Sequence, residues 1–394
     1  MTSGLPSKIL VVDNDQGVLN AISQGLEAYK IQCSVAKDWE SALYMFNSHK
    51  FDLCLISLEL DALQGTALIQ KWRNHEMESK RFAAFVLSTS QQRKSGDSAL
   101  IKELGDVAMV FKPIKIPNLL SIMANAMQMS RARASMLHVK DKLISPLLKT
   151  KKYEKAASIA KEKLEPVGDK GKFFSSQIYD AAGKVGAAIE LLKKLIESDP
   201  SNMSYHNELA KIYLQTGNLK EAQKSYELAD KAAPGNIERV NDMANLYLKL
   251  KMPDKSLGKF TELIKLNPEH KDMKYDVYDK LSDAGYLQHA QEFCRQTSTP
   301  KELVRHFNNK GVLFSKAGEF PDAIDEYEKA VKLIPGSKEL YRILYNMAIA
   351  HINLKTFDHL KKAHSLLLES LKMQPNFDKA KEKLKITERY VGRK

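Results

Sequence analysis

Polar residues follow or close four of the short apolar runs in the first part of the chain. They are Asp13 and Asn14 after the run Lys8–Val12, Ser57 at the end of Leu53–Ser57, Ser88 at the end of Phe82–Ser88, and Lys112 after Val107–Phe111. Carboxylates hold hard cations such as Mg²⁺, and hydroxyl and ammonium groups hydrogen-bond anionic oxygens. Such a set could assist chemistry at an anionic group, provided that the fold brings its members together.

The fold expected for this region brings them together. A fifth apolar run, Gln32–Ala36, completes a series that is typical of strands buried on both faces. Amphipathic helical patterns, such as Val18, Ile22 and Leu26, lie between the runs. Strands that alternate with helices predict an α/β fold with a doubly wound, five-stranded parallel sheet of the flavodoxin type. The ligand site of such a fold lies at the carboxyl ends of the strands.

Residues 1–128 resemble the CheY-like receiver domain of two-component response regulators. The resemblance rests on Ile9–Asp13, on Phe51–Leu53 with Gly65, on Ser88, and on Lys112–Pro113. It implies an acidic pair after the first strand and an acceptor aspartate after the third, which together hold Mg²⁺. It also implies that Ser88 and Lys112 stand where a working receiver binds the phosphoryl oxygens.

The chain departs from the receiver pattern at two positions. Asn14 replaces the second acid, and Ser57 occupies the acceptor position, which is fixed by Asp52 five residues earlier. A neutral hydroxyl cannot form an acyl phosphate, and it adds no charge to hold Mg²⁺. We therefore interpret the domain as a pseudo-receiver with a vestigial phosphorylation pocket and no cofactor. Lys112, without an aspartyl partner at the acceptor position, is expected to bind Asp13.

The second part of the chain has a helical period of 34 residues, counted on Pro200, Pro234 and Pro268. A glycine and, five residues later, an alanine recur with this period: Gly183, Gly217, Gly285 and Gly318, with Ala188, Ala222, Ala290 and Ala323. The small alanine lets paired helices approach closely, and the proline ends the second helix. The pattern resembles the tetratricopeptide repeat, an α-solenoid. Copies begin near 169, 203, 237, 304 and 341, with a poorer copy near 271.

Four segments are predicted along the chain. They are a receiver-like domain over 1–128, a connecting helix with an atypical helix pair over 129–168, the repeat array over 169–376, and a capping helix over 377–394. The last segment alternates lysine and glutamate, as suits a polar cap on a solenoid. The predicted fold class is therefore α/β plus all-α.

The resemblance also predicts a peptide groove on the first helix of each repeat. Its polar positions are Asn207, Lys211, Asn241, Asn245, Arg305 and Asn308. Amides and cations at these places could hydrogen-bond the backbone of an extended peptide or its terminal carboxylate. The alternative is that asparagine and lysine are simply suitable residues for exposed helix surfaces.

Composition and motifs argue against several functional classes. The three cysteines are far apart, and none of the ten histidines lies in a metal-binding motif, so we expect reduced thiols and no metal site. No catalytic constellation is found, which predicts a protein that is not an enzyme. Without a signal peptide or a run of 18 apolar residues, the chain is expected to be cytoplasmic and without membrane contact.

The net charge of +13 is unevenly distributed. Residues 1–125 hold 13 basic and 13 acidic residues, so the excess lies wholly in the remainder. This asymmetry could favour acidic partners or weak, non-specific nucleic-acid binding, but the preferred explanation is a solvated, lysine-rich helix surface. We expect no specific nucleic-acid partner, because basic and acidic residues are interleaved.

These observations predict a non-catalytic adaptor or regulator in a bacterial two-component pathway. Its expected protein partners are a histidine kinase, a phosphotransfer domain or a response regulator, with a peptide in the repeat groove. The fourth and fifth helices of the receiver could also form a homodimer. Two alternatives remain: a phosphorylated response regulator with an acidic site rearranged around Asp13 and Asp15, and a weak nucleic-acid-binding output.

Overall fold

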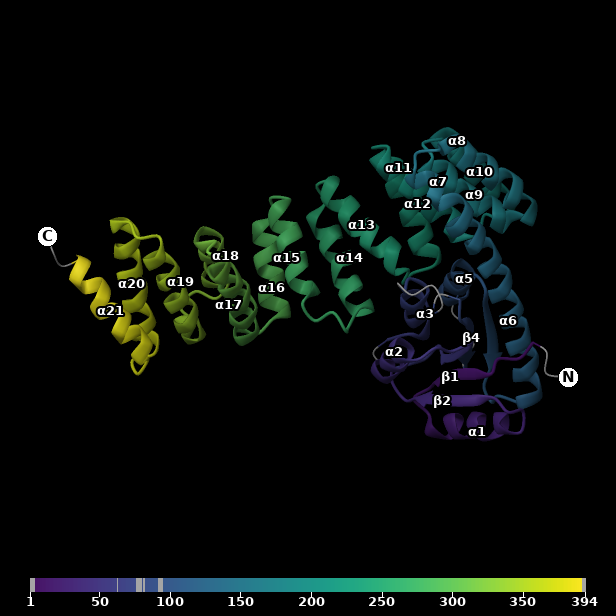
Figure 1. Ribbon diagram of the computed structural model, residues 1–394, viewed down its shortest axis with the longest axis horizontal. Coiled ribbons are helices and arrows are strands. Elements are labelled where there is room, and N and C mark those ends of the chain that lie inside the picture. Colours follow the sequence, from purple (N-terminus) through teal and green to yellow (C-terminus); the bar gives the residue numbers. More distant parts are fainter. Residues whose placement is uncertain (1–3, 62, 76–79, 81, 91–94, 392–394) are drawn as a thin grey trace. The chain divides into compact units, whose positions relative to one another are not determined.

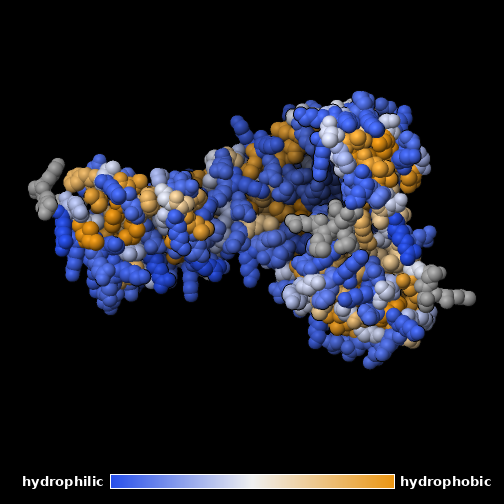
Figure 2. All heavy atoms as spheres, viewed as in Figure 1, coloured by the Kyte–Doolittle hydropathy of each residue, from blue (hydrophilic) through white to orange (hydrophobic). Residues whose placement is uncertain are grey.

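The computed structural model describes residues 4–61, 63–75, 80, 82–90 and 95–391 (Figure 1). The chain forms two compact units, residues 1–271 and residues 272–394. The predicted boundary at 128 falls inside one continuous helix, Ile116–His138, whereas those at 168 and 376 fall between helices, and all three stay predictions as domain limits. Within the described ranges, every helix is too short or too polar to cross a membrane. The face drawn in Figure 2 is mainly hydrophilic, with hydrophobic side chains in separate patches.

The first unit begins with a five-stranded, wholly parallel sheet. Its strands are β1 (Lys8–Val12), β2 (Gln32–Ala36), β3 (Leu53–Ser57), β4 (Ala84–Thr89) and β5 (Val107–Phe111). Their order in the sheet is β2-β1-β3-β4-β5, so the strand order reverses beside β1. The α/β fold with a doubly wound parallel sheet is therefore confirmed. Only β4 differs from its predicted bounds: it begins two residues later and ends on Thr89 instead of Ser88.

Helices cover both faces of the sheet. They are α1 (Gln16–Glu27), α2 (Trp39–Ser48), α3 (Gly65–Arg73), α5 (Ser95–Leu104) and α6 (Ile116–His138). Successive residues of a strand point to opposite faces. Ile9 and Val11 accordingly pack with α1 and α6, whereas Leu10 and Val12 pack with α2 and α3. Burial on both faces explains why the strands have continuous apolar sequences rather than alternating ones.

Helices α3 and α5 are joined by one buried arginine. The guanidinium of Arg73, the last residue of α3, donates to the carbonyl oxygens of Leu104, Gly105 (2.6 Å) and Asp106 (3.2 Å). These carbonyls lie at the end of α5, where helical hydrogen bonding stops and other donors are required. Burial lowers the pKa of Arg73 to about 9. The end of α5 is thus fixed relative to α3.

A change of helix type follows α6. A π-helical turn, Val139–Ile144, connects it to α7 (Ser145–Lys149). Pro146, in the first turn of α7, has no N–H to continue an α-helical pattern. The wider turn before it is a common local adjustment in an otherwise continuous helix. The segment predicted as a connecting helix is therefore helical but not uniformly α-helical.

The helices that follow form the repeat pairs, except for the first and the last of them. In the first unit they are α8 (Tyr153–Lys163), α9 (Asp169–Ala181), α10 (Val185–Ser198), α11 (Met203–Gln215), α12 (Leu219–Ala232), α13 (Ile237–Lys249) and α14 (Pro253–Leu266). In the second unit they are α15 (Met273–Asp283), α16 (Leu287–Thr297), α17 (Pro300–Ala317), α18 (Phe320–Leu333), α19 (Tyr341–Asn353), α20 (Phe357–Met373) and α21 (Asp378–Val391). The copies predicted near 169, 203, 237 and 341 begin at those residues.

The recurring small residues have the roles that the period suggests. The four alanines at 188, 222, 290 and 323 are fully buried. The four glycines of the turns have left-handed backbones, with φ between 75° and 86°. Lys251 stands 34 residues after Gly217 and adopts the same conformation, with φ of 59°. This turn therefore imposes on a lysine a backbone that favours glycine.

Replacing Lys251 with glycine should stabilise the protein. The exposed lysine pays for its left-handed backbone, and glycine removes that cost while adding some entropy to the unfolded chain, for a net gain of about 0.5–1 kcal/mol. The urea midpoint of the full chain measures the change. The matched control is Lys249→Gly, because Lys249 is exposed and lies in α13, where glycine should destabilise by up to about 1 kcal/mol. Equal effects of the two variants would contradict the prediction.

The second unit contains a buried histidine pair. Nδ1 of His351, in α19, lies 2.8 Å from Nδ1 of His359, in α20, and His351 is only 4% exposed. Burial, with the nearby His359, lowers the pKa of His351 to about 4 from an ordinary value of 6.5. His351 is therefore neutral in the folded protein at pH values where the unfolded chain would be protonated.

The second unit should lose stability in mild acid. As pH falls from 6.5 toward 4, the unfolded chain takes up a proton that folded His351 does not, so about 2–3 kcal/mol should be lost. Denaturant unfolding at pH 7 and pH 4.5 tests this, with amide exchange in α19 assigning the change to the second unit. His351→Gln should remove most of the pH dependence, and an unchanged dependence would refute the assignment.

Candidate functional site

The carboxyl ends of the strands bring three of the sequence-predicted residues into contact. Nζ of Lys112 lies 2.6 Å from Oδ2 of Asp13 and donates to Oγ of Ser57 at 3.1 Å. The hydroxyl of Ser57 donates to the carbonyl of Glu59 at 3.1 Å. Asp13 and Ser57 are 1% and 0% exposed. The structure thus contains the Lys112–Asp13 ion pair and places a neutral hydroxyl beside it.

The other residues around this pocket have local partners. The amide of Asn14 donates to Asp61 at 3.3 Å. The carboxylate of Asp15 accepts from the backbone N–H of Gly17 and Val18, and so caps the N-terminus of α1. Asp15 therefore stabilises the start of α1 through one of its carboxylate oxygens.

Two hydroxyls close β4. Ser88 is buried and pairs in register with Ser57 of β3. Thr89, one residue further, donates to the carboxylate of Glu59. Sequence reasoning named Ser88 but not Thr89, because the predicted strand ended one residue too early.

The donor set does not fit the Mg²⁺ that the receiver resemblance implies. It offers one carboxylate at the expected positions, Asp13, and that carboxylate is already paired with Lys112. Asn14 and Ser57 add no negative charge, whereas protein magnesium sites use carboxylates to offset the cost of dehydrating the ion. The pocket is instead a self-contained set of one ion pair and its hydrogen bonds.

A second polar site lies where the receiver-like domain meets the first repeats. Lys102 of α5 binds Asp199 at 2.9 Å, and Lys71 of α3 binds Glu269 at 2.7 Å. Between them, Gln70 donates to the carbonyl of Gly235 at 3.0 Å. The three partners Asp199, Gly235 and Glu269 belong to loops that follow α10, α12 and α14. Helices α3 and α5 therefore contact three successive inter-repeat loops.

An apolar contact supports these polar ones. Leu100 of α5 is 2% exposed and packs with Met203, Ala229 and Ala233 of the repeats. Gly96, one turn earlier, lies so near Pro234 that an added Cβ would be 3.0 Å from its ring. A larger residue at position 96 would push α5 away from the repeats.

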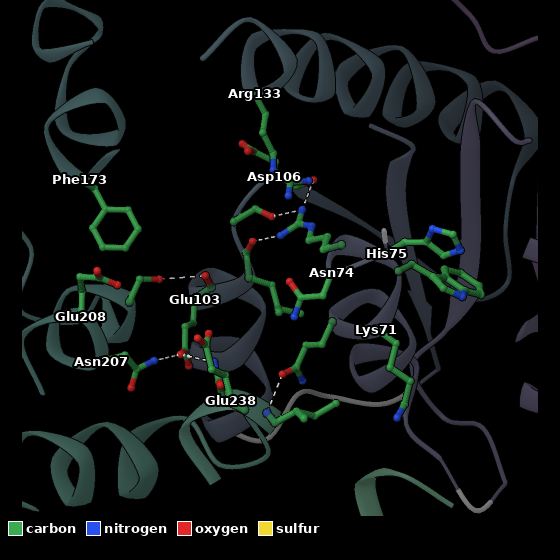
Figure 3. Close-up of a pocket in the computed structure, with 18 of the residues that line it drawn as sticks. Lys71, Asn74, His75, Glu103, Asp106, Arg133, Phe173, Asn207, Glu208 and Glu238 are labelled. Carbon is green, nitrogen blue, oxygen red and sulfur yellow. Dashed lines mark hydrogen bonds between the residues drawn. The ribbon is translucent and has the colours of Figure 1, made fainter. Parts of the chain in front are cut away.

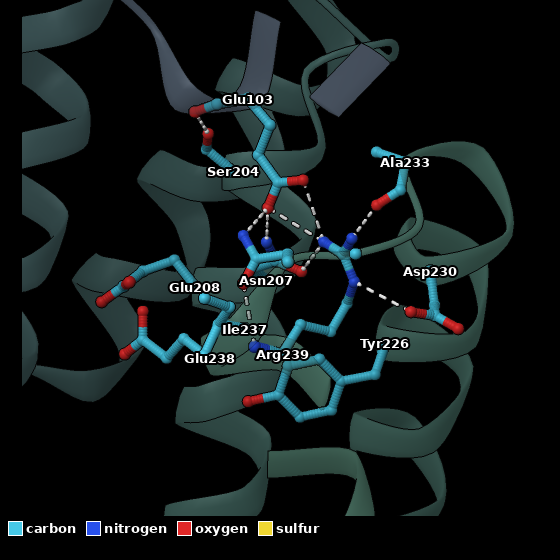
Figure 4. Close-up of polar contacts among 12 residues, drawn as sticks. Glu103, Ser204, Asn207, Glu208, Tyr226, Asp230, Ala233, Ile237, Glu238 and Arg239 are labelled. Atoms are coloured by element: carbon cyan, nitrogen blue, oxygen red, sulfur yellow. Dashed lines mark hydrogen bonds and ion pairs between the residues drawn. The ribbon is translucent and has the colours of Figure 1, made fainter. Parts of the chain in front are cut away.

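The centre of this contact is a fully buried ion pair (Figure 4). Nη1 of Arg239, from α13, lies 2.9 Å from Oε1 and 3.0 Å from Oε2 of Glu103, from α5. Their side chains are 0% and 3% exposed. The amides of Asn207 and Asn236 also donate to Oε1 of Glu103. Burial raises the pKa of Glu103, although Arg239 and the two amides act in the opposite direction.

A cavity of about 780 Å³ lies beside the ion pair (Figure 3). Phe173 and Glu208 from the repeats lie across the view from Lys71 and His75 of the receiver-like domain. Burial raises the pKa of Glu208. The cavity walls carry both charge signs, so the space does not select ligands by charge alone.

The six predicted groove positions differ in their surroundings. Asn207 is 9% exposed and is engaged by Glu103. Lys211 forms an ion pair with Glu238, and Asn245 donates to the backbone of Asn241. In the second unit, Arg305 is exposed and Asn308 accepts from Asn346 at 2.7 Å. Their role in peptide binding stays a prediction.

Sequence reasoning missed both Glu103 and Arg239. A signal for Arg239 did exist: the residue 34 positions earlier is Tyr205, which is 5% exposed and packs in the repeat core. A charged residue at a core position of the period needs a buried partner. No comparable signal marks Glu103, because its partner lies 136 residues away.

Replacing Glu103 with alanine should loosen the contact between α5 and the repeats. Loss of Glu103 leaves buried Arg239 with Asp230, 3.5 Å from its Nε, as the remaining counter-charge, at a cost of up to about 3–5 kcal/mol. Amide hydrogen exchange in α5 should therefore accelerate by about a hundredfold or more. Lys102→Ala is the matched control, since the exposed pair with Asp199 contributes less than about 1 kcal/mol. Similar rates in both variants would show that the buried pair does not hold the contact.

Comparisons with known proteins agree with this architecture. The family model described as the response regulator receiver domain matches residues 9–124, and a tetratricopeptide repeat model matches residues 181–246. A probable cyclic di-GMP phosphodiesterase of Vibrio cholerae is 28% identical over 141 residues, which cover 36% of this chain and 31% of that protein. The first curated relatives are matched over only 21% to 34% of their own length.

Solved structures are similar to separate parts of the chain. The chemotaxis response regulator CheY4 of Vibrio cholerae is 20% identical, with a TM-score of 0.28, over 30% of this chain and 98% of that chain. A tetratricopeptide repeat protein of Parabacteroides merdae is 15% identical, with a TM-score of 0.35, over 64% of this chain and 98% of that chain. On the two family models, the chain is a two-component signalling protein in which a response regulator receiver domain is joined to tetratricopeptide repeats.

Proposed function

We propose that this chain is a non-catalytic adaptor of a two-component pathway whose receiver domain works without being phosphorylated. The observation that carries the proposal is the position of Ser57. Its hydroxyl stands at the acceptor position, is 0% exposed, and accepts a hydrogen bond from Lys112, which is itself paired with Asp13. These three side chains satisfy one another.

The chemistry of phosphoryl transfer supports the same conclusion. Transfer to a receiver needs a carboxylate nucleophile and a cation that offsets the charge on the transferred group. Ser57 supplies no carboxylate, and Asp13, the acid retained at the expected position, is paired with Lys112. A buried hydroxyl is also a poor substrate for a hydroxyl kinase, because it cannot reach that enzyme's active site.

We propose protein partners for both parts of the chain. A histidine kinase, a phosphotransfer domain or a response regulator would recognise the receiver fold, so that the adaptor competes with a working receiver. Helices α3 and α5 already contact the repeats, so such a partner has to use the remaining surfaces or displace them. The same contact opposes a homodimer through α5 and α6, because a second copy would have to compete with the repeats for α5.

The proposed adaptor is cytoplasmic and is not an enzyme. Cys33, Cys54 and Cys294 are free thiols, as expected in a reducing compartment. The name of the phosphodiesterase relative describes that protein, of which this chain matches 31%. The activity of that relative is therefore not part of the proposal.

Treatment with acetyl phosphate and Mg²⁺ tests the proposal. We expect intact-mass spectrometry of the wild-type chain to show no phosphoryl adduct, because the pocket lacks the acceptor carboxylate. The double variant Asn14→Asp, Ser57→Asp restores both missing acids and should gain an acid-stable, hydroxylamine-sensitive adduct. Asp15→Asn in the wild-type background controls for a rearranged site. A Mg²⁺-dependent adduct on the wild-type chain, lost in that variant, would overturn the proposal.

A further inference from the structure

The repeats contribute three donors that converge on one carboxylate. The guanidinium of Arg239 contacts both oxygens of Glu103, and the amides of Asn207 and Asn236 meet on Oε1 (Figure 4). Two-point contact by a guanidinium and additional amide donors is the way proteins recognise a carboxylate specifically. All three donors belong to the repeats, whereas the carboxylate belongs to the receiver domain.

The donors are held in place by the repeats themselves. The guanidinium of Arg239 also donates to the carbonyl of Ala233 and to Oδ1 of Asn207 (2.9 Å), and its Nε lies 3.5 Å from Asp230. Asn236 caps α13 by accepting from the N–H of Arg239 at 2.9 Å. None of these contacts involves the receiver domain, so the donors keep their positions without Glu103. A site organised before its ligand arrives binds at a lower entropic cost.

The rest of α5 defines the shape of the ligand. Leu100 precedes Glu103 by three residues, so both lie on the same side of the helix. Leu100 enters the apolar contact with Met203 and Ala233, while Gly96 permits close approach at Pro234. The repeats therefore receive one helical surface with a small residue, a leucine and a glutamate in order.

We propose that Arg239, Asn207 and Asn236 form a carboxylate-binding site in the repeats, which Glu103 occupies from within the same chain. The ligand class is an amphipathic helix of a partner protein, with a glutamate three residues after a leucine, that competes with α5 for the site. That the competing helix belongs to a partner protein rests on the proposed adaptor function. The site itself does not, and its test uses neither Mg²⁺ nor a phosphodonor.

The test measures binding of a fluorescein-labelled peptide of residues 95–106 to the full chain by fluorescence anisotropy. In the wild-type chain the peptide competes with α5 of the same molecule, so binding should be weak. The variant E103Q removes the charge of the internal ligand and keeps its size. It should bind the peptide at least about tenfold more tightly, because an internal competitor lowers apparent affinity by the fraction of open sites.

Three controls assign the effect to the site. A peptide carrying E103Q should not bind either chain, and the double variant E103Q, N207A should lose the gained affinity. D97N changes a charge on the same helix but leaves the three donors and the other contacts of α5 intact, and it should bind the peptide within about threefold of the wild-type chain. Circular dichroism confirms that each variant is folded.

A second measurement does not depend on any variant. Unlabelled wild-type peptide at saturating concentration should accelerate amide exchange in α5 of the wild-type chain, because it displaces that helix from the repeats, and the E103Q peptide should not. If folded E103Q binds the peptide no more tightly than the wild-type chain, or if α5 exchange is unaffected by the peptide, Glu103 and Arg239 are a structural joint only and the proposal is wrong.

Discussion

The buried ion pair between Glu103 and Arg239 determines how the receiver domain and the first repeats fit together. Moving two charges out of water costs several kcal/mol for each ion, so the arrangement persists only where other groups complete the hydrogen bonding of both. Asn207 and Asn236 complete that of Glu103, and Asp230 with the carbonyl of Ala233 completes that of Arg239. The position of Glu103 depends in turn on Arg73, because Arg73 fixes the end of α5 that carries Glu103.

The pocket at the carboxyl ends of the strands obeys the same requirement that a buried charge has a partner, but here the ion pair lies within the receiver domain. Asp13 is buried and cannot remain charged without a partner, and the half-buried Lys112 supplies one. In a pocket with two more carboxylates, Lys112 and a cation would share the negative charge. With Asn14 and Ser57 in their places, one lysine and one aspartate are in balance, and there is no surplus charge for a ligand to neutralise. Glu103–Arg239 and Lys112–Asp13 are therefore both ion pairs between groups of the same chain.

Much of the fold could be predicted from the sequence because strands and repeats are marked by patterns among residues that are close in the sequence. Four strands have their predicted bounds, since three of them are largely apolar runs between polar residues and β2 lies between helical patterns. The repeats were recognisable because small and aromatic residues recur at one period. The Lys112–Asp13 contact followed from the fold, since both residues end strands of one sheet.

The contact between the domains could not be predicted in this way. Glu103 lies on an ordinary amphipathic helix, and nothing near it in the sequence indicates a buried carboxylate. Asn207 was placed in a peptide groove by its position in the repeat, but its amide is used by a residue 104 positions earlier. Side chains that serve long-range pairs have no local pattern, and only a charge at a core position, such as Arg239, reveals that a partner exists.

The contacts of α3 and α5 with three inter-repeat loops have a consequence for how such a chain can change in length. The contacted residues Asp199, Gly235 and Asn267 lie about one repeat apart, at separations of 36 and 32 residues, and they are bound by Lys102, Gln70 and Lys71. Inserting or deleting a residue between these loops would shift one contacted residue relative to the other two. The segment between these loops therefore keeps a fixed length as long as all three contacts are kept.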